Sequence, residues 1–161
     1  RDAAMLAGSV IDSLAADQDA LINAALSGDT GSVSAYFAEL TGGAYSVVMF
    51  KEETLFVQTR DGVVLPAAYL SAGTRAILAI AMRLALLERV LNGRRAFLLL
   101  DDPLLACDTV RLERTLSSLL ALSRNGWQIL YFSVDRDVAD WALEHRRDGV
   151  RLLHLPPLHR S

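Results

Sequence analysis

The stretch FLLLDDPLLACD at residues 97–108 constrains the fold of this chain more than any other part of the sequence. Four apolar residues followed by two carboxylates predict a buried strand that ends at the acids. In open α/β sheets, ligands bind just outside the carboxyl ends of the strands. Adjacent carboxylates at such a place, here Asp101 and Asp102, suit a hydrated Mg²⁺ ion and an oriented water molecule. The alternative is a pair of turn or capping carboxylates before Pro103.

The second half of the chain alternates between strand and helix patterns. Strands separated by helices of this length predict βαβ units, and hence an α/β fold with a largely parallel sheet and flanking helices. The predicted strands are residues 96–101, 127–133 and 150–155. The predicted helices are residues 109–124 and 136–146.

The first half of the chain has a different pattern. β-branched and aromatic residues at 45–50 and 54–59 flank a short polar link and predict a β-hairpin, with a third strand at 63–65. A short helix is predicted around residues 36–40. A long amphipathic helix is predicted from residue 71 to about residue 91, where an Asn-Gly pair stops it.

A second motif, LSAGT at residues 70–74, opens this long helix. The first turn of a helix carries unpaired amides and a partial positive charge, so it can bind phosphate. The Ser71 hydroxyl can donate to a phosphate oxygen, and Gly73 lets the backbone approach a ligand closely. The alternative is that Ser71 only caps the helix.

The two motifs, LSAGT followed by FLLLDDPLLACD, resemble the signature motif, Walker B strand and D-loop of ATP-binding-cassette ATPases. The resemblance is closest to the SMC-like branch, whose heads sit on coiled-coil arms and act on DNA. It implies the C-terminal half of a P-loop NTPase head, with Mg²⁺ and ATP as cofactors. Residues 36–161 would form this lobe. Residues 1–35 would form a helical segment, which is either the root of a coiled-coil arm or a plain amphipathic surface helix.

The resemblance also implies roles for single residues. Asp101 would hold Mg²⁺ through water, and Asp102 would stand where most members carry the glutamate that polarises the attacking water. Ser71 and Gly73 would contact the γ-phosphate of ATP bound to the opposite subunit. Asp108 would be the D-loop aspartate that aligns two nucleotide sites across a dimer, unless it simply caps the helix that follows.

One residue departs from the family pattern at the end of the strand predicted at 127–133. The family carries a switch histidine there, whereas this strand end offers Ser133 and Asp135 and no histidine. Asp135 is therefore a catalytic candidate, although an acid repels a γ-phosphate unless Mg²⁺ or the adjacent Arg136 intervenes. This departure argues against robust hydrolysis and leaves nucleotide-dependent dimerisation open.

The phosphate-binding loop of such ATPases is missing from the sequence. No G-x-x-x-x-G-K-[ST] pattern occurs, and the single lysine, Lys51, follows a strand and not a glycine run. We therefore expect a piece of a longer protein that is inactive alone and becomes an ATPase only with the N-terminal Walker A lobe of the same protein. The expected assembly is a head–head homodimer, with DNA as a partner by family analogy alone.

Composition limits the remaining function classes. The formal charge of −3 over 161 residues does not indicate nucleic-acid binding by this chain as a whole. No apolar run is long enough to cross a membrane, and the single cysteine excludes an internal disulfide framework, so we expect a cytoplasmic protein. Two alternatives to a slow DNA-repair or recombination ATPase stay open. One is a degenerate, non-catalytic lobe for dimerisation or docking, and the other is a magnesium-dependent phosphotransfer or nuclease domain.

Overall fold

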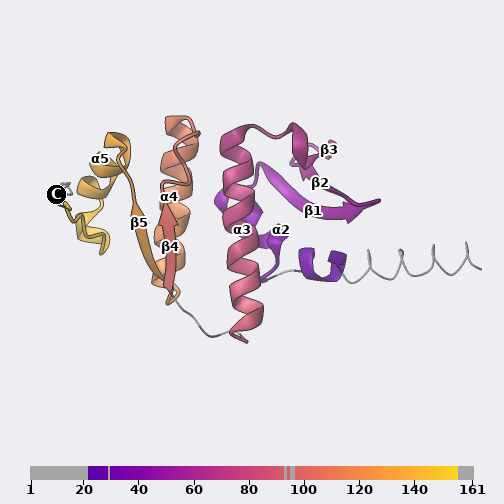
Figure 1. Ribbon diagram of the computed structural model, residues 1–161, viewed down its shortest axis with the longest axis horizontal. Helices are drawn as coiled ribbons and strands as arrows, with labels where there is room; N and C mark the ends of the chain where they lie inside the picture. The colour runs from indigo at the N-terminus through magenta and orange to yellow at the C-terminus, as the bar shows by residue number, and fades with distance from the viewer. Residues whose placement is uncertain (1–21, 29, 93, 95–96, 156–161) are drawn as a thin grey trace, which may run out of the picture.

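The computed structural model describes residues 22–28, 30–92, 94 and 97–155. Within these residues the strands form two separate sheets, an antiparallel sheet in the order β1-β2-β3 and a parallel pair of β4 and β5. Figure 1 shows the long helix α3 standing between the two sheets. No helix in the described residues is long and apolar enough to cross a membrane.

The antiparallel sheet consists of β1 (Tyr45–Lys51), β2 (Thr54–Thr59) and β3 (Val64–Pro66). The first two strands form the predicted hairpin, joined through Glu52 and Glu53, which both have positive φ angles, of 49° and 58°. Positive φ at both central residues is the geometry of a two-residue hairpin turn whose twist matches that of the strands. At the centre of the pair, Val48 lies opposite Val57, and both side chains are fully buried.

Two helices build the core beside this sheet. Helix α2 (Val33–Leu40) packs against β1 and α3, and its Phe37 and Leu40 side chains are fully buried. Helix α3 (Ala72–Val90) follows a short 3-10 helix, η1 (Ala67–Tyr69). The face of α3 that the sequence predicts to be apolar is buried, including Ile77, Ile80, Ala81 and Leu84.

The second unit is a βαβ motif followed by one more helix. It comprises β4 (Phe97–Asp101), α4 (Thr109–Arg124), β5 (Gln128–Phe132) and α5 (Arg136–Glu144), with a terminal 3-10 helix, η2 (Arg146–Asp148). The two strands are parallel, and Asp101 pairs with Phe132 at their carboxyl ends. Helix α4 lies against the strand pair in Figure 1. Along β4 the side chains alternate, so that Leu98 and Leu100 are buried whereas Phe97 and Leu99, which point to the opposite face, are exposed.

The structure confirms the predicted α/β class, but one predicted strand does not form. The hairpin, the third strand, both long helices and the parallel pair lie within about two residues of their predicted positions. The predicted strand at 150–155 is wrong: its described residues form no strand, and Leu153 and Leu155 are exposed. A strand needs a neighbour for its backbone hydrogen bonds, and no described strand pairs with this segment. The predicted N-terminal helix lies largely outside the described residues, of which 22–26 are helical.

Candidate functional site

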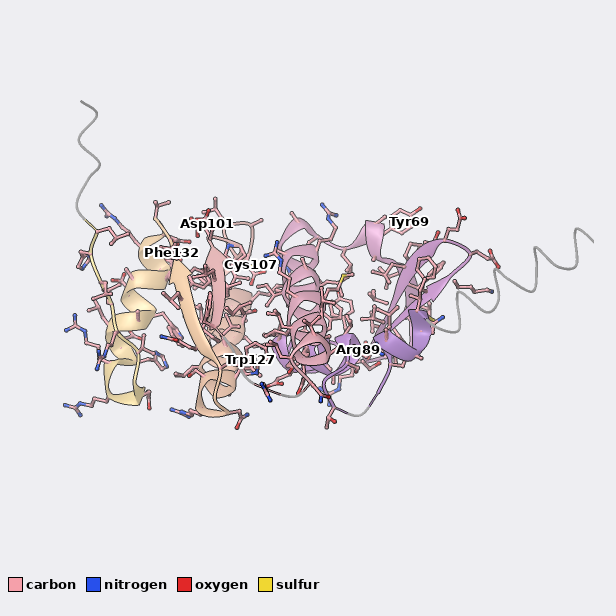
Figure 2. All side chains as sticks on the ribbon, turned by 60° about the horizontal axis from the view of Figure 1, so that its bottom comes forward. Tyr69, Arg89, Asp101, Cys107, Trp127 and Phe132 are labelled. Atoms are coloured by element: carbon pink, nitrogen blue, oxygen red, sulfur yellow. The ribbon has the colours of Figure 1, made fainter. Side chains whose placement is uncertain are left out.

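The predicted site residues lie along one side of the molecule. Because β4 and β5 are parallel, their carboxyl ends meet at one edge of the pair. Figure 2 shows Asp101, Phe132 and Cys107 at this end of the strands and Trp127 at the other. Helix α3 begins on the same side of the molecule, so the signature-like and Walker-B-like segments face the same region (Figure 1).

Asp101 is the last residue of β4, and its side chain is exposed. The strand pairing holds its backbone opposite Phe132. Within the described part of the chain, no hydrogen bond or ion pair engages the Asp101 carboxylate. Its oxygens therefore remain available for water or a cation.

Asp102 is the first residue after the strand and is half-buried. Its φ of 43° lies in the left-handed region, where Asp is one of the few residue types found with some frequency. Its backbone N–H donates to the Phe132 carbonyl at 2.8 Å, which continues the ladder between the strands by one bond. One carboxylate oxygen accepts a hydrogen bond of 2.7 Å from the Ser133 hydroxyl, and the other lies 3.5 Å from the Val134 amide. The side chain is thus directed toward the end of β5.

Asp135 lies close to Asp102 and Ser133 but also has a structural role of its own. It is the N-cap of α5, and one carboxylate oxygen accepts a hydrogen bond of 3.0 Å from the Asp137 amide. Its backbone N–H donates to the Ser133 hydroxyl oxygen at 3.0 Å. Ser133 therefore bridges the two acids. The sequence offered one signal for this link, a serine at a strand end between acids, but the pairing of β4 with β5 was needed to see it.

Ser71 caps α3, as the structural alternative for this residue predicts. Its hydroxyl accepts a hydrogen bond of 3.1 Å from the Thr74 amide and lies 2.8 Å from the Thr74 hydroxyl. The residue is nevertheless exposed, so capping leaves it accessible to a ligand. The Arg75 guanidinium donates to the Leu70 carbonyl, which ties the first turn of α3 to the segment before it.

Gly73 is buried, and the close approach that it permits is to protein backbone. A Cβ atom at this position would lie 2.8 Å from the Ala106 carbonyl oxygen and 2.9 Å from Cys107 Sγ, closer than real Cβ contacts. The start of α3 thus packs directly on the segment that resembles the D-loop. Sequence reasoning linked Gly73 to a phosphate and missed this packing role, since the sequence gives no measure of the distance between the two motifs.

Asp108 also occupies a capping position. One oxygen accepts a hydrogen bond of 3.0 Å from the Arg111 amide, and the other forms an ion pair of 3.0 Å with the Arg111 side chain. Both side chains are about half exposed, so this pair contributes little to stability. In the loop before it, Leu104 is buried as an anchor and Leu105 is exposed.

Two further ionisable groups lie in or near this loop, Cys107 within it and Tyr131 close to Leu104. Burial raises the pKa of the Cys107 thiol, with a further increase from Asp108, so this cysteine is not an activated nucleophile. Burial also raises the pKa of Tyr131 to about 12. The backbone of Leu104 lies close enough to lower the pKa of Tyr131, although the contact does not meet the geometry of a hydrogen bond. The Tyr131 hydroxyl therefore has no hydrogen-bond partner among the described residues.

The donor set fits Mg²⁺ only as part of a larger site. No group of three or more His, Cys, Asp or Glu side chains in the described residues is placed to hold a metal ion. Mg²⁺ usually keeps several waters and takes one or two carboxylates together with substrate phosphates, and the exposed Asp101 carboxylate can serve in that way. A cavity of about 410 Å³ lies elsewhere, and none of the predicted site residues lines it.

Comparison with known proteins identifies similar sequences in bacteria and archaea. No family model matches the sequence. The uncharacterized protein YhaN of Bacillus subtilis (strain 168) is 38% identical over 107 residues, covering 65% of this chain and 11% of the relative. The DNA double-strand break repair Rad50 ATPase of Pyrococcus abyssi (strain GE5 / Orsay) is 35% identical over 123 residues, covering 72% of this chain and 14% of the relative. The chain thus spans only a small part of the length of these relatives.

Solved structures of SMC ATPase heads share the fold. The SMC head domain with an extended coiled coil, bound to the C-terminal domain of ScpA from Pyrococcus furiosus, aligns with a TM-score of 0.50 at 17% identity, covering 68% of this chain and 28% of that chain. A structure from work on ATP-driven dimerization and DNA-stimulated activation of SMC ATPases aligns with a TM-score of 0.51 at 18% identity, covering 68% and 71%. The fold and the sequence similarity together identify the chain as a partial, C-terminal region of an SMC-like ATPase head.

Proposed function

We propose that this lobe completes an ATP site at a head–head dimer interface, where the full protein slowly hydrolyses ATP in DNA repair or recombination. One observation carries the proposal. Two carboxylates extend from the end of β4, and the start of α3 packs on the loop that follows them through Gly73 and Ala106. The three motifs therefore form one surface, and the phosphate-binding loop that this surface lacks belongs to the N-terminal lobe.

Each acid on this surface has a distinct proposed role. The exposed Asp101 carboxylate holds the water shell of Mg²⁺, which neutralises phosphate charge when bound. Asp102 orients the attacking water, and its side chain is one methylene shorter than the usual glutamate, so it works slowly. Asp135 stands near the γ-phosphate, with Arg136 beside it to offset the repulsion between like charges.

The signature-like segment meets the nucleotide held by the other head. Ser71 is exposed at the start of a helix of 19 residues, where the free amides and the helix dipole favour phosphate. Gly73 fixes that helix start on the loop of Ala106, which ends at Asp108. Asp108 then lies at the same interface and aligns the two nucleotide sites.

The N-terminal Walker A lobe of the same protein is the proposed partner for the open face of the parallel pair. Parallel sheets are normally covered on both faces, yet Phe97, Leu99, Leu130 and Phe132 on this face are 60%, 55%, 39% and 44% exposed. Within the described residues, β5 also pairs only with β4, so its second edge is open to another strand. An apolar face beside an open strand edge suits a lobe that extends the same sheet.

The cellular role rests on similarity alone. One relative is a DNA double-strand break repair ATPase, and the chain's own charge of −3 gives no separate support for a DNA surface. We place DNA contact in the complete protein, and we place that protein in the cytoplasm because a single cysteine fits a reducing compartment.

A non-catalytic lobe that dimerises or docks partners is the second candidate. It is favoured by Asp102, whose carboxylate already accepts a hydrogen bond from Ser133, and by the acid at position 135. An independent phosphotransfer or nuclease domain has less support. It needs additional acids around the metal, and in the described residues no three such ligands come together, while Asp135 caps a helix.

Steady-state ATP turnover of the complete protein tests the proposal. Asp101→Asn should abolish magnesium-dependent turnover, and Asp102→Asn should retain ATP binding but block turnover and trap the dimer. Asp102→Glu should increase the rate. The control is Asp148→Asn, which removes an exposed carboxylate that pairs with Arg124 away from the site.

The 161-residue chain alone should neither hydrolyse ATP nor bind it at micromolar concentrations in calorimetry. Equal turnover of wild type and Asp102→Asn would leave the non-catalytic lobe as the better account.

A further inference from the structure

We propose that Ser133 is a positioning residue that sets the orientation of the Asp102 carboxylate for water activation. The inference rests on the proposed ATPase reaction and adds a residue that none of the three motifs contains. It starts from one contact between the ends of neighbouring strands, in which the Ser133 hydroxyl lies 2.7 Å from Asp102 Oδ1.

The direction of this hydrogen bond follows from the second partner of the hydroxyl. The Asp135 amide donates to Ser133 Oγ at 3.0 Å, because a backbone N–H can only donate. A serine hydroxyl has one proton, and an ionised carboxylate can only accept. The chain of bonds therefore runs from the Asp135 amide through the Ser133 hydroxyl to the Asp102 carboxylate. Bonds aligned in this way polarise one another and strengthen the whole chain.

Asp102 depends on this contact because its other short hydrogen bond is made by the backbone. Its amide is bound to the Phe132 carbonyl at 2.8 Å, which fixes the main chain at a φ of 43°. The remaining carboxylate contact, to the Val134 amide, is long at 3.5 Å. Among the described residues, the Ser133 hydroxyl is thus the one short contact of the Asp102 side chain. Without it the carboxylate can rotate about its side-chain bonds.

Rotation of the Asp102 carboxylate matters for the proposed reaction, because the carboxylate must be correctly positioned to orient the attacking water. Displacing a catalytic group by about 1 Å can cost on the order of a hundredfold in rate. Ser133→Ala removes the donor, so turnover should fall by roughly tenfold or more, while ATP binding, which Asp102 does not carry, should change little. Ser133→Thr keeps the hydroxyl and should retain most of the rate.

The test uses the complete protein and measures kcat and KM for ATP in wild type, Ser133→Ala, Ser133→Thr, Asp102→Asn and the double variant Ser133→Ala/Asp102→Asn. Ser123→Ala is the matched control. It removes another serine hydroxyl of the same unit, one that donates to the Leu120 carbonyl within α4 and lies outside the site. A thermal unfolding scan of each variant checks that the heads remain folded.

The proposal predicts a loss of at least tenfold in kcat for Ser133→Ala with KM within about twofold, rescue by threonine, and no further loss when Ser133→Ala is added to Asp102→Asn. If Asp102→Asn blocks turnover but Ser133→Ala matches wild type or exceeds it, the positioning role is wrong and the ATPase proposal survives. If wild type and Asp102→Asn behave alike, the ATPase proposal fails and takes the role of Ser133 with it.

Discussion

Gly73 in the first turn of α3 lies against the backbone of Ala106, so closely that a Cβ atom on Gly73 would sit 2.8 Å from the Ala106 carbonyl oxygen. This contact joins two segments that are far apart in the sequence, the start of the long helix and the loop after β4. The packing of Gly73 on Ala106 therefore determines how Ser71 and Asp108 lie relative to each other. A change at Gly73 should therefore act on both motifs together.

Substitution of Gly73 by alanine should destabilise the protein by about 1–3 kcal/mol, the usual cost of overpacking. The sign is diagnostic, because glycine to alanine inside a helix otherwise stabilises by up to about 1 kcal/mol. Urea unfolding of the 161-residue chain, followed by circular dichroism, measures the effect. Ala79→Gly, at an exposed position in the same helix, should cost about 1 kcal/mol and serves as the propensity control. A stabilised Gly73→Ala variant would mean that the loop does not pack on α3.

Much of the local structure could be predicted from sequence because its causes are local. The bounds of α4 follow from Asp108 before it and Asn125 after it, which serve as its two caps. The hairpin follows from two β-rich runs around a short polar link. The strand predicted at 150–155 failed because a strand depends on a neighbour as well as on its own residues. Residues 150–155 were predicted as a strand, but no described strand lies in place to pair with them.

The site likewise contains residues that could be predicted from local sequence and contacts that could not. Asp101 and Asp102 could be predicted because acids after an apolar strand are a local pattern. The hydrogen bond from Ser133 to Asp102 joins residues 31 apart and depends on the register of β4 with β5. The packing of Gly73 likewise depends on how α3 meets the loop. Such contacts arise from tertiary structure, so a single sequence does not reveal them.

The open face of the parallel pair should respond differently in the isolated chain and in the complete protein. Leu99→Glu adds a charge at a side chain that is 55% exposed, so the unfolding free energy of the 161-residue chain should change by less than about 0.5 kcal/mol. In the complete protein the same charge would be buried without a partner, which is strongly unfavourable. ATP binding, measured by calorimetry, should then fall at least tenfold.

Gln128→Glu provides the matched control for that charge. Gln128 is exposed at the start of β5 and pairs with Phe97, so it lies at the rim of the same face. Its position already carries a polar side chain, and ATP binding should be retained. If Leu99→Glu and wild type bind ATP equally in the complete protein, the N-terminal lobe does not cover this face.

Tyr131 should titrate late and should make the fold sensitive to alkali. Its pKa is raised to about 12 by burial, from an ordinary value of 10, so the folded state favours the neutral hydroxyl. This contribution to stability is present below pH 10 and is lost as the pH rises toward 12. The tyrosinate absorbance of wild type minus that of Tyr131→Phe should therefore rise near pH 12. A difference centred near pH 10 would show that the ring is not buried.

The same variant should leave stability at neutral pH almost unchanged. The Tyr131 hydroxyl has no hydrogen-bond partner in the described structure, so its removal should shift the unfolding free energy by less than about 1 kcal/mol. Urea unfolding at pH 7 and at pH 10.5 separates the two effects. Wild type should lose stability between these values, and Tyr131→Phe should lose less.

The central claim is that the start of α3 meets a nucleotide bound by a second head, and sedimentation velocity of the complete protein tests it most directly. Wild type should dimerise through its heads when ATP and Mg²⁺ are added. Ser71→Arg should not, because a bulky cation would occupy the phosphate position. The fold should survive, since loss of a helix cap costs only about 1 kcal/mol. ATP binding by each head should also persist, because the phosphate-binding loop lies on the other lobe. Thr54→Arg, at an exposed position of the β1–β2 hairpin, controls for the added charge. Dimerisation of Ser71→Arg equal to that of wild type would contradict the account and leave LSAGT as a helix cap alone.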